Sequence, residues 1–123
     1  MNKLATGVDL IEIARIAEAV ERYGERFLRR VFTSREVSLT SGRVESLAVR
    51  FAAKEAAAKA LGCGIGEVSW LEIEVLHGPN KQPKLQLHGN AAQIAAEQGL
   101  TLWSISLSHA ETFAIAMVTA LGN

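Results

Sequence analysis

The segment from about Glu45 to Leu61 constrains the fold more than any other part of the chain. It contains the run FAAKEAAAKALG, in which alanine, the residue with the highest helix propensity, predominates. Gly62, Gly64 and Gly66 follow directly, and glycine commonly marks the end of a helix. We therefore predict a long helix that ends at Gly62, with small side chains that allow other groups to approach closely.

The chain before this helix is predicted to form one strand and one shorter helix. Apolar and β-branched residues predict a first strand at Leu4–Leu10, and apolar residues at helical spacing predict a helix at Ile11–Arg22. Residues 27–46 show no clear period. We predict a connector there, with at most one short helix that begins with Thr33 or Ser34 as its N-cap.

The chain after the long helix is predicted to be mostly strand. Residues 69–76 alternate apolar side chains with Glu72 and Glu74, as a strand with one solvent-facing side does. Four further elements follow the turn HGPNKQP: a strand at 84–88, a helix at 90–98 capped by Asn90, and strands at 101–108 and 112–121. The order β-α-α-β-β-α-β-β predicts an α+β fold with a largely antiparallel sheet packed against the long helix.

Length and charge limit the classes of function. A chain of 123 residues is predicted to form one domain, 1–123, and its formal net charge of zero argues against nucleic acid or an anionic membrane as a partner. No apolar run approaches the roughly 20 residues of a membrane helix. With one cysteine, Cys63, and no signal-peptide pattern, we expect a soluble cytoplasmic protein. The hydrophobic fraction of 49% leaves apolar area for a subunit interface.

Glu55 and Lys59 share one face of the predicted long helix because they are four residues apart. One interpretation is a surface ion pair that contributes about 0.3–0.5 kcal/mol. The other is that the two side chains hold Mg²⁺ and a phosphate oxygen of a bulky ligand. Asp9 presents a similar choice, between a turn residue or helix N-cap and a second carboxylate ligand for the same ion.

Three segments resemble the signature segments of one enzyme family. They are GVDLIEIARI at Gly7–Ile16, RFAAKEAAAKALGCGI at Arg50–Ile65 and SISLSH at Ser104–His109. In this order they are similar to the holo-[acyl-carrier-protein] synthases, the small single-domain branch of the 4′-phosphopantetheinyl transferases. The resemblance implies the fold of that family and its reaction. In that reaction, 4′-phosphopantetheine moves from coenzyme A to a serine of apo acyl carrier protein, in support of fatty acid biosynthesis, and adenosine 3′,5′-bisphosphate is released.

The resemblance also implies catalytic roles for three residues. Asp9 and Glu55 would bind Mg²⁺, and Lys59 would neutralise the phosphates of coenzyme A. The serine of the carrier protein must lose a proton, which either Glu55 or a water molecule on the metal would accept.

Five further residues are candidates for contact with coenzyme A. Lys54 belongs to the motif but points about 100° away from Glu55 around the helix, so it is alternatively a solvated or structural charge. Ser108 and His109 would meet the nucleotide, although a histidine after a strand is more often a packed or capped residue. Gly62 and Gly64 would let the backbone approach coenzyme A, or would simply end the helix.

The resemblance implies two kinds of partner. Acyl carrier proteins are acidic, so Arg15 and Arg22 are candidates for a basic docking patch, with a solvated helix face as the alternative. Members of the family form homotrimers with active sites between subunits. A different class of function is a non-catalytic trimeric module that binds coenzyme A or acyl carrier protein. The presence of Asp9, Glu55 and Lys59 together argues against that class, and the length argues against a two-domain transferase.

Overall fold

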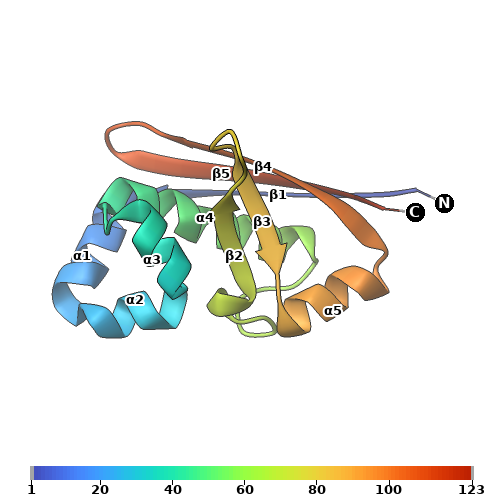
Figure 1. Ribbon diagram of the computed structural model, residues 1–123, viewed down its shortest axis with the longest axis horizontal. Helices are drawn as coiled ribbons and strands as arrows, with labels where there is room; N and C mark the ends of the chain where they lie inside the picture. Colours follow the sequence, from blue (N-terminus) through green and yellow to red (C-terminus); the bar gives the residue numbers. More distant parts are fainter. Residues whose placement is uncertain (1, 123) are drawn as a thin grey trace.

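A three-stranded antiparallel sheet and one long helix form the frame of the molecule, of which the computed structural model describes residues 2–122 (Figure 1). The sheet contains β1, Lys3–Glu12, β5, Phe113–Gly122, and β4, Leu100–His109, in the order β1-β5-β4. The helix is α4, Val44–Ala60, which packs against β1 and β5. Strand β5 therefore lies at the centre of the sheet although it comes last in the sequence.

Shorter elements cover the other sides of α4. Three helices precede it in the sequence: α1, Ile13–Tyr23, α2, Glu25–Val31, and α3, Ser34–Thr40. After it come the 3₁₀ helix η1, Trp70–Glu72, the strands β2, Ile73–His77, and β3, Pro83–Leu87, and the helix α5, Gly89–Glu97. Strands β2 and β3 pair antiparallel and form a second sheet. Among residues 2–122, no helix has the length and apolar character needed to cross a membrane.

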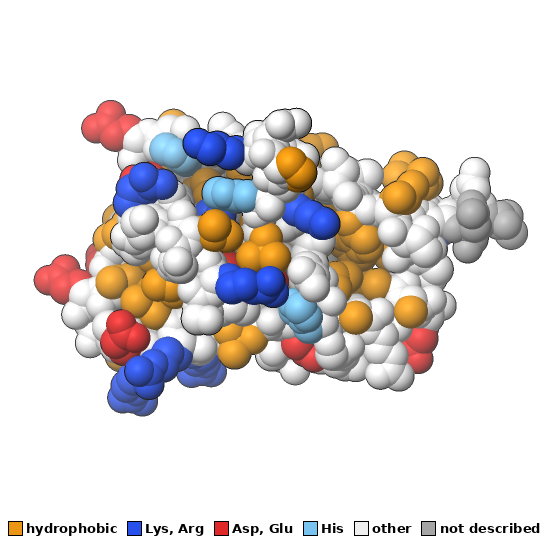
Figure 2. All heavy atoms as spheres, viewed as in Figure 1, with side chains coloured by type: hydrophobic (Ala, Val, Ile, Leu, Met, Phe, Trp, Pro, Cys, Tyr) orange, Lys and Arg blue, Asp and Glu red, His pale blue; other side chains and the backbone are white. Residues whose placement is uncertain are grey.

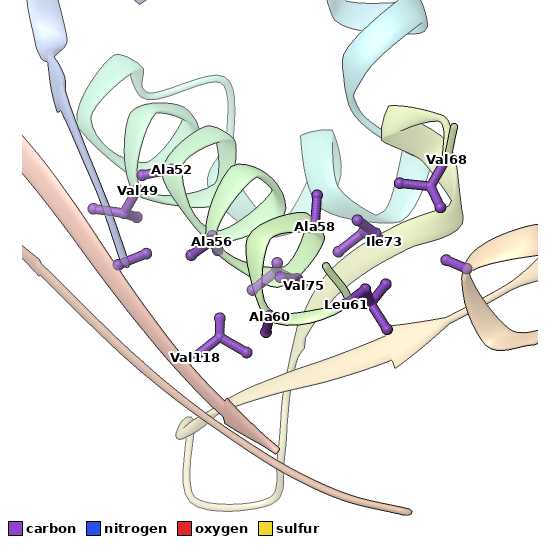
Figure 3. Close-up of a cluster of buried hydrophobic side chains, with 14 of the residues drawn as sticks. Val49, Ala52, Ala56, Ala58, Ala60, Leu61, Val68, Ile73, Val75 and Val118 are labelled. Carbon is purple, nitrogen blue, oxygen red and sulfur yellow. The ribbon is translucent and has the colours of Figure 1, made fainter. Parts of the chain in front are cut away.

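Helix α4 is buried on almost every side, which explains its alanine-rich sequence. Its alanines are at most 6% exposed, and they belong to the same core as Val118 of β5 and Ile73 of β2. Figure 3 shows side chains of α4 entering this core from several directions. Since each alanine fills little space, the neighbouring strands can approach the helix closely from both sides.

The closest approach occurs where β1 crosses α4 at Gly7. A Cβ atom at Gly7 would collide with the carbonyl oxygen of Ala56, so only glycine fits there. The backbones of the strand and the helix are consequently in direct contact. This contact fixes how the residues after Gly7 on β1 lie relative to the second half of α4.

The predicted α+β class, with an antiparallel sheet packed against a long helix, is confirmed. The element order differs because residues 27–46, predicted to be a connector, contain most of α2 and all of α3. Helix α3 is the predicted short helix, with Thr33 as its N-cap and Glu36 completing a reciprocal capping box. Both helices have only seven residues, so their stability depends on tertiary packing rather than on local sequence signals.

Strand β1 ends at Glu12, whereas the sequence predicted a first strand that ends at Leu10. It pairs with β5 along its whole length, and Asp9 lies opposite Ala116. These pairs stabilise the additional strand residues. Helix α1 consequently begins at Ile13 instead of Ile11.

The predicted strand at 69–76 begins only at Ile73, because Trp70–Glu72 form a 3₁₀ helix. The prediction that this strand has a solvent-facing side is wrong, since Glu74 is only 1% exposed. Its carboxylate is bound by side chains from three positions: Thr33, Arg35 and His88. These partners replace water around the buried charge.

Candidate active site

Asp9, Glu55 and Lys59 meet where β1 crosses α4. The ammonium group of Lys59 donates hydrogen bonds to Asp9 Oδ1 at 3.1 Å and to the carbonyl oxygen of Val8 at 2.9 Å. The contact between Gly7 and α4 brings this part of the strand alongside the last turns of the helix. Residues that are distant in the sequence thus form one small charged cluster.

The two carboxylates of this cluster repel one another. Partial burial raises the pKa of Glu55, the negative charge of Asp9 raises it further, and Lys59 opposes both effects. A site with two repelling carboxylates favours a bound cation, which relieves the repulsion. Mg²⁺ prefers oxygen ligands and commonly takes one or two carboxylates together with waters and substrate phosphates.

The donor set fits such an ion only if other groups complete its coordination. Among residues 2–122, no group of three or more His, Cys, Asp or Glu side chains is arranged to hold a metal. If a cation binds here, Asp9 and Glu55 would supply two carboxylates, and water or phosphate oxygens would have to supply the remaining ligands. This requirement is typical of Mg²⁺ in enzymes that act on phosphates.

The structure does not support the two simpler interpretations, a surface ion pair between Glu55 and Lys59 and a turn or helix-cap role for Asp9. Lys59 pairs with Asp9, and within the described part of the chain no ion pair joins it to Glu55. Asp9 lies inside β1, and the N-cap position of α1 is Glu12, so Asp9 is neither a turn residue nor a helix cap.

Lys54 is a structural charge and lies outside this cluster. Its side chain is 0% exposed, and its ammonium group donates to Glu36 Oε1 at 2.8 Å and to two backbone carbonyl oxygens. With no accessible atom it cannot touch a cofactor, so the predicted contact between Lys54 and coenzyme A is wrong. The alternative of a solvated charge is wrong as well, whereas the structural alternative is correct. Burial lowers the pKa of Lys54, and Glu36 opposes this effect.

Gly62 and Gly64 follow the end of α4 on the surface. Gly62 has a φ of +79°, a conformation that side chains rarely adopt, and its N–H donates to the carbonyl oxygen of Lys59. No atom lies within 4 Å of a Cβ placed at either glycine. Gly62 therefore ends the helix as predicted, while an approach of coenzyme A to this backbone stays a prediction.

Ser108 and His109 are the last residues of β4, and both are exposed. His109 pairs with Ala114 of β5, which faces α4, whereas Ser108 pairs with Ile115 on the opposite side. By the alternation of the strand, His109 lies on the same side of the sheet as Asp9. Ser108 and His109 therefore lie on opposite sides of the sheet, and their contacts with a nucleotide stay predictions.

A cluster of positive charge that the sequence did not predict lies where α4 meets the β2-β3 hairpin. Arg50 is buried on α4 and binds His77 Nε2 at 2.8 Å and the carbonyl oxygen of Val75. Burial lowers the pKa of His77, and the charges of Arg50 and Lys81 lower it further. Figure 2 shows Lys, Arg and His side chains gathered on this face of the molecule. Arg50 and His77 are 27 residues apart, and only the motif around Arg50 pointed to this region.

Helices α1 and α2 present exposed arginines beside an open pocket. Arg15 and Arg22 are both on the surface of α1, as predicted. A pocket of about 550 Å³ begins at Tyr23, the last residue of α1, and is lined mainly by aromatic and arginine side chains: Tyr23, Phe27, Phe51, Trp70, Arg26 and Arg30. Phe51 and Trp70 stack with their ring centroids 4.5 Å apart. The surface thus combines positive charge with an apolar recess.

Comparison with known proteins identifies close relatives of this chain. The model of the 4′-phosphopantetheinyl transferase superfamily matches residues 5–118. A holo-[acyl-carrier-protein] synthase of Herpetosiphon aurantiacus is 53% identical over 97% of this chain and 99% of its own length. One from Dehalococcoides mccartyi is 50% identical over 95% and 98%. The crystal structure of the Helicobacter pylori holo-[acyl-carrier-protein] synthase in complex with coenzyme A is 35% identical, with a TM-score of 0.86 over 94% of this chain and 98% of that one.

Proposed function

The chain belongs to the 4′-phosphopantetheinyl transferase superfamily, and on this premise we propose how its residues carry out the transfer. Its activity is that of a holo-[acyl-carrier-protein] synthase, which serves fatty acid biosynthesis. The enzyme moves 4′-phosphopantetheine from coenzyme A to a serine of apo acyl carrier protein and releases adenosine 3′,5′-bisphosphate. The meeting of Asp9, Glu55 and Lys59 at the crossing of β1 and α4 is the observation that carries the assignment of roles.

We propose that Lys59 binds the phosphates of coenzyme A and that Asp9 and Glu55 hold Mg²⁺ beside them. The serine oxygen forms a bond to the phosphorus of the pantetheine arm while the bond to adenosine 3′,5′-bisphosphate breaks. Negative charge moves onto the leaving phosphate, where the ammonium group of Lys59 stabilises it. When bound, Mg²⁺ would add positive charge at the phosphate oxygens.

Glu55 is the proposed base for the serine hydroxyl. Its carboxylate accepts the proton while the serine oxygen bonds to phosphorus. In the absence of a cation, partial burial and the neighbouring Asp9 raise the pKa of Glu55. The same side chain then serves as a metal ligand and as a proton acceptor.

The rest of coenzyme A is proposed to extend toward the positive cluster at the β2-β3 hairpin. Arg50 and Lys81 supply positive charge there that would attract a phosphate group, and His77, whose pKa is lowered, would take part as a hydrogen-bonding side chain. His109 and Ser108, at the end of β4, and the exposed backbone at Gly62 and Gly64 are the other proposed contacts. Their exposure supports this role, since each is open to a ligand.

The carrier protein is proposed to dock on α1 and α2. Arg15 and Arg22 would pair with its acidic side chains, and the neighbouring pocket beside Phe51 and Trp70 would accept an apolar side chain. A mixed surface of this kind suits a protein partner better than a small anion. Coenzyme A and the carrier protein as substrates also favour a location in the cytoplasm.

Residues 1–123 are proposed to act as one transferase domain in a homotrimer with active sites between subunits. The face of the sheet opposite α4 exposes several large apolar side chains: Leu4, Val8, Leu10, Leu102, Ile115, Met117 and Leu121. Contiguous apolar surface of this kind commonly marks a protein interface. The number of subunits follows from the resemblance to the family.

Mass spectrometry of apo acyl carrier protein, incubated with the enzyme, coenzyme A and Mg²⁺, tests the proposal. We expect the carrier protein to gain one phosphopantetheine group, and we expect a chelator or Glu55→Gln to abolish the gain. Glu97→Gln, on the surface of α5, makes the same chemical change away from the site and should leave the gain intact. Full transfer by Glu55→Gln would contradict the proposed roles, and no transfer by the wild type would favour a non-catalytic binding module.

A further inference from the structure

Lys59 forms an ion pair with Asp9, which is one of the two proposed metal ligands. Its ammonium group lies 3.1 Å from Asp9 Oδ1 and 2.9 Å from the carbonyl oxygen of Val8. Asp9 is mostly covered, with 20% of its side chain exposed, whereas 53% of the Lys59 side chain is exposed. The more exposed partner of this ion pair is therefore the lysine.

The two contacts of Lys59 differ in kind. Val8 belongs to the edge strand β1, and its carbonyl oxygen is a neutral acceptor on the backbone. Asp9 is a charged acceptor that a divalent cation would also require. An ammonium group and Mg²⁺ repel each other strongly when both lie against one carboxylate. This repulsion would drive Lys59 from Asp9, while its hydrogen bond to the separate acceptor Val8 can remain.

We propose that Lys59 is the resident counter-ion of Asp9 in the metal-free enzyme and exchanges Asp9 for a phosphate of coenzyme A when the site is loaded. This inference rests on the proposed roles of Asp9 as metal ligand and Lys59 as phosphate ligand. Val8 acts as the fixed point of the exchange, because its carbonyl oxygen holds the ammonium group in both states. A lysine has three donors, so the donor released from Asp9 and the unused third donor are both available to the phosphate.

The exchange couples the binding of the two ligands. Without coenzyme A, Lys59 competes with the divalent cation for Asp9 and weakens cation binding. With coenzyme A bound, the phosphate draws Lys59 away and removes the competition. Each ligand then strengthens the binding of the other by the same factor, as thermodynamic linkage requires. Replacing Lys59 should therefore reduce the factor by which coenzyme A strengthens cation binding.

Cation binding to the purified enzyme tests this coupling without any turnover. The probe is Mn²⁺, whose free concentration is measured by electron paramagnetic resonance, with Mg²⁺ as a competitor. We expect Lys59→Met to bind Mn²⁺ about two- to fivefold more tightly than the wild type when coenzyme A is absent. Coenzyme A should strengthen Mn²⁺ binding less in Lys59→Met, by the same factor.

Lys3→Met is the matched control for this titration. Lys3 lies at the other end of β1 and donates to Gln98, so its loss removes the same charge far from Asp9. This variant should bind Mn²⁺ as the wild type does. Equal or weaker Mn²⁺ binding by Lys59→Met would overturn the inference.

Nuclear magnetic resonance of the lysine ammonium groups separates exchange from a general effect of charge. The ammonium group of Lys59, followed by its ¹⁵N signal, should be ordered in the metal-free enzyme, become less ordered when Mg²⁺ alone is added and only Val8 still holds it, and regain its order with coenzyme A. A Lys59 signal that Mg²⁺ leaves unchanged, while Asp9→Asn abolishes Mn²⁺ binding, would overturn this inference alone. Mn²⁺ binding that survives Asp9→Asn would overturn the proposed metal site as well.

Discussion

Replacing Lys54 by methionine should destabilise the protein strongly, because the carboxylate of Glu36 would stay buried without its cation. The ammonium group of Lys54 donates to Glu36 Oε1 at 2.8 Å and to the carbonyl oxygens of Trp70 and Ile73 at 3.0 and 2.6 Å. Removing one partner of a buried ion pair costs about 3–5 kcal/mol of unfolding free energy. In a chain of this length, such a loss lowers the midpoint of thermal unfolding by about 10–25 °C.

Urea unfolding, followed by tryptophan fluorescence at one fixed protein concentration, measures this loss. Lys54→Met combined with Glu36→Gln removes both charges and should recover at least about half of it, since no uncompensated charge remains. Lys84→Met, at an exposed position on β3, is the matched control and should change stability by less than about 0.5 kcal/mol. A loss below about 1 kcal/mol for Lys54→Met, or a double variant no more stable than the single one, would refute the reasoning.

Three further substitutions test the contact between β1 and α4, the candidate active site and the hydrogen bonds around the buried Glu74. Gly7→Ala forces a Cβ atom against the carbonyl oxygen of Ala56, so we expect a loss of about 1–3 kcal/mol in urea unfolding together with lower transferase activity. Glu55 has a raised pKa in the folded protein, so its ionisation lowers stability as the pH rises from 4.5 through that raised value. Glu55→Gln should therefore have a higher melting temperature than the wild type at pH 7 without divalent cations, with a difference that vanishes near pH 4. Burial acts to raise the pKa of Glu74, but hydrogen bonds from Thr33, His88 and Arg35, together with the charge of Arg35, lower it overall. Arg35→Met should consequently be less stable than the wild type at pH 7, and circular dichroism should show the difference shrinking as the pH falls below 4.5.

Each of these changes has a matched control and a contrary outcome. A Cβ atom at Gly64 has no other atom within 4 Å, so Gly64→Ala should leave stability nearly unchanged. Equal losses of stability for Gly7→Ala and Gly64→Ala would contradict the close contact of β1 with α4. Glu97→Gln should not raise the melting temperature at pH 7. A rise equal to that of Glu55→Gln would contradict the repulsion and burial assigned to Glu55. Arg29→Met removes an exposed ion pair with Glu25. If its stability depended on pH as that of Arg35→Met does, the role assigned to the buried carboxylate of Glu74 would be contradicted.

The sequence predicted those features that depend on local signals. The alanine run and Gly62 located α4, and the resemblance pointed to Asp9, Glu55 and Lys59, which the fold does bring together. Local patterns did not show how β1 would reach these residues. Its extension past Leu10 depends on pairing with β5, whose residues come more than one hundred positions later in the sequence.

Features that depend on distant partners were missed for the same physical reason. The burial of Lys54 is set by Glu36, 18 residues earlier, and by backbone oxygens that follow α4. A lysine in a helix is usually solvated, and only the folded chain shows which acceptors surround it. Arg50 and His77 form their contact across a similar distance in sequence, so neither residue alone indicated the positive cluster.

The central position of β5 determines when during synthesis the enzyme becomes active. β5 is the last strand to leave the ribosome, yet it lies between β1 and β4 and pairs Lys3 with Gly122. A nascent chain that lacks β5 already contains Asp9, Glu55 and Lys59, but β1 then packs against α4 without the ladder of backbone hydrogen bonds that pairs it with β5. Contacts between such distant residues form late and slowly compared with local helices. Transferase activity should therefore appear only after β5 has been released, in a single step rather than gradually.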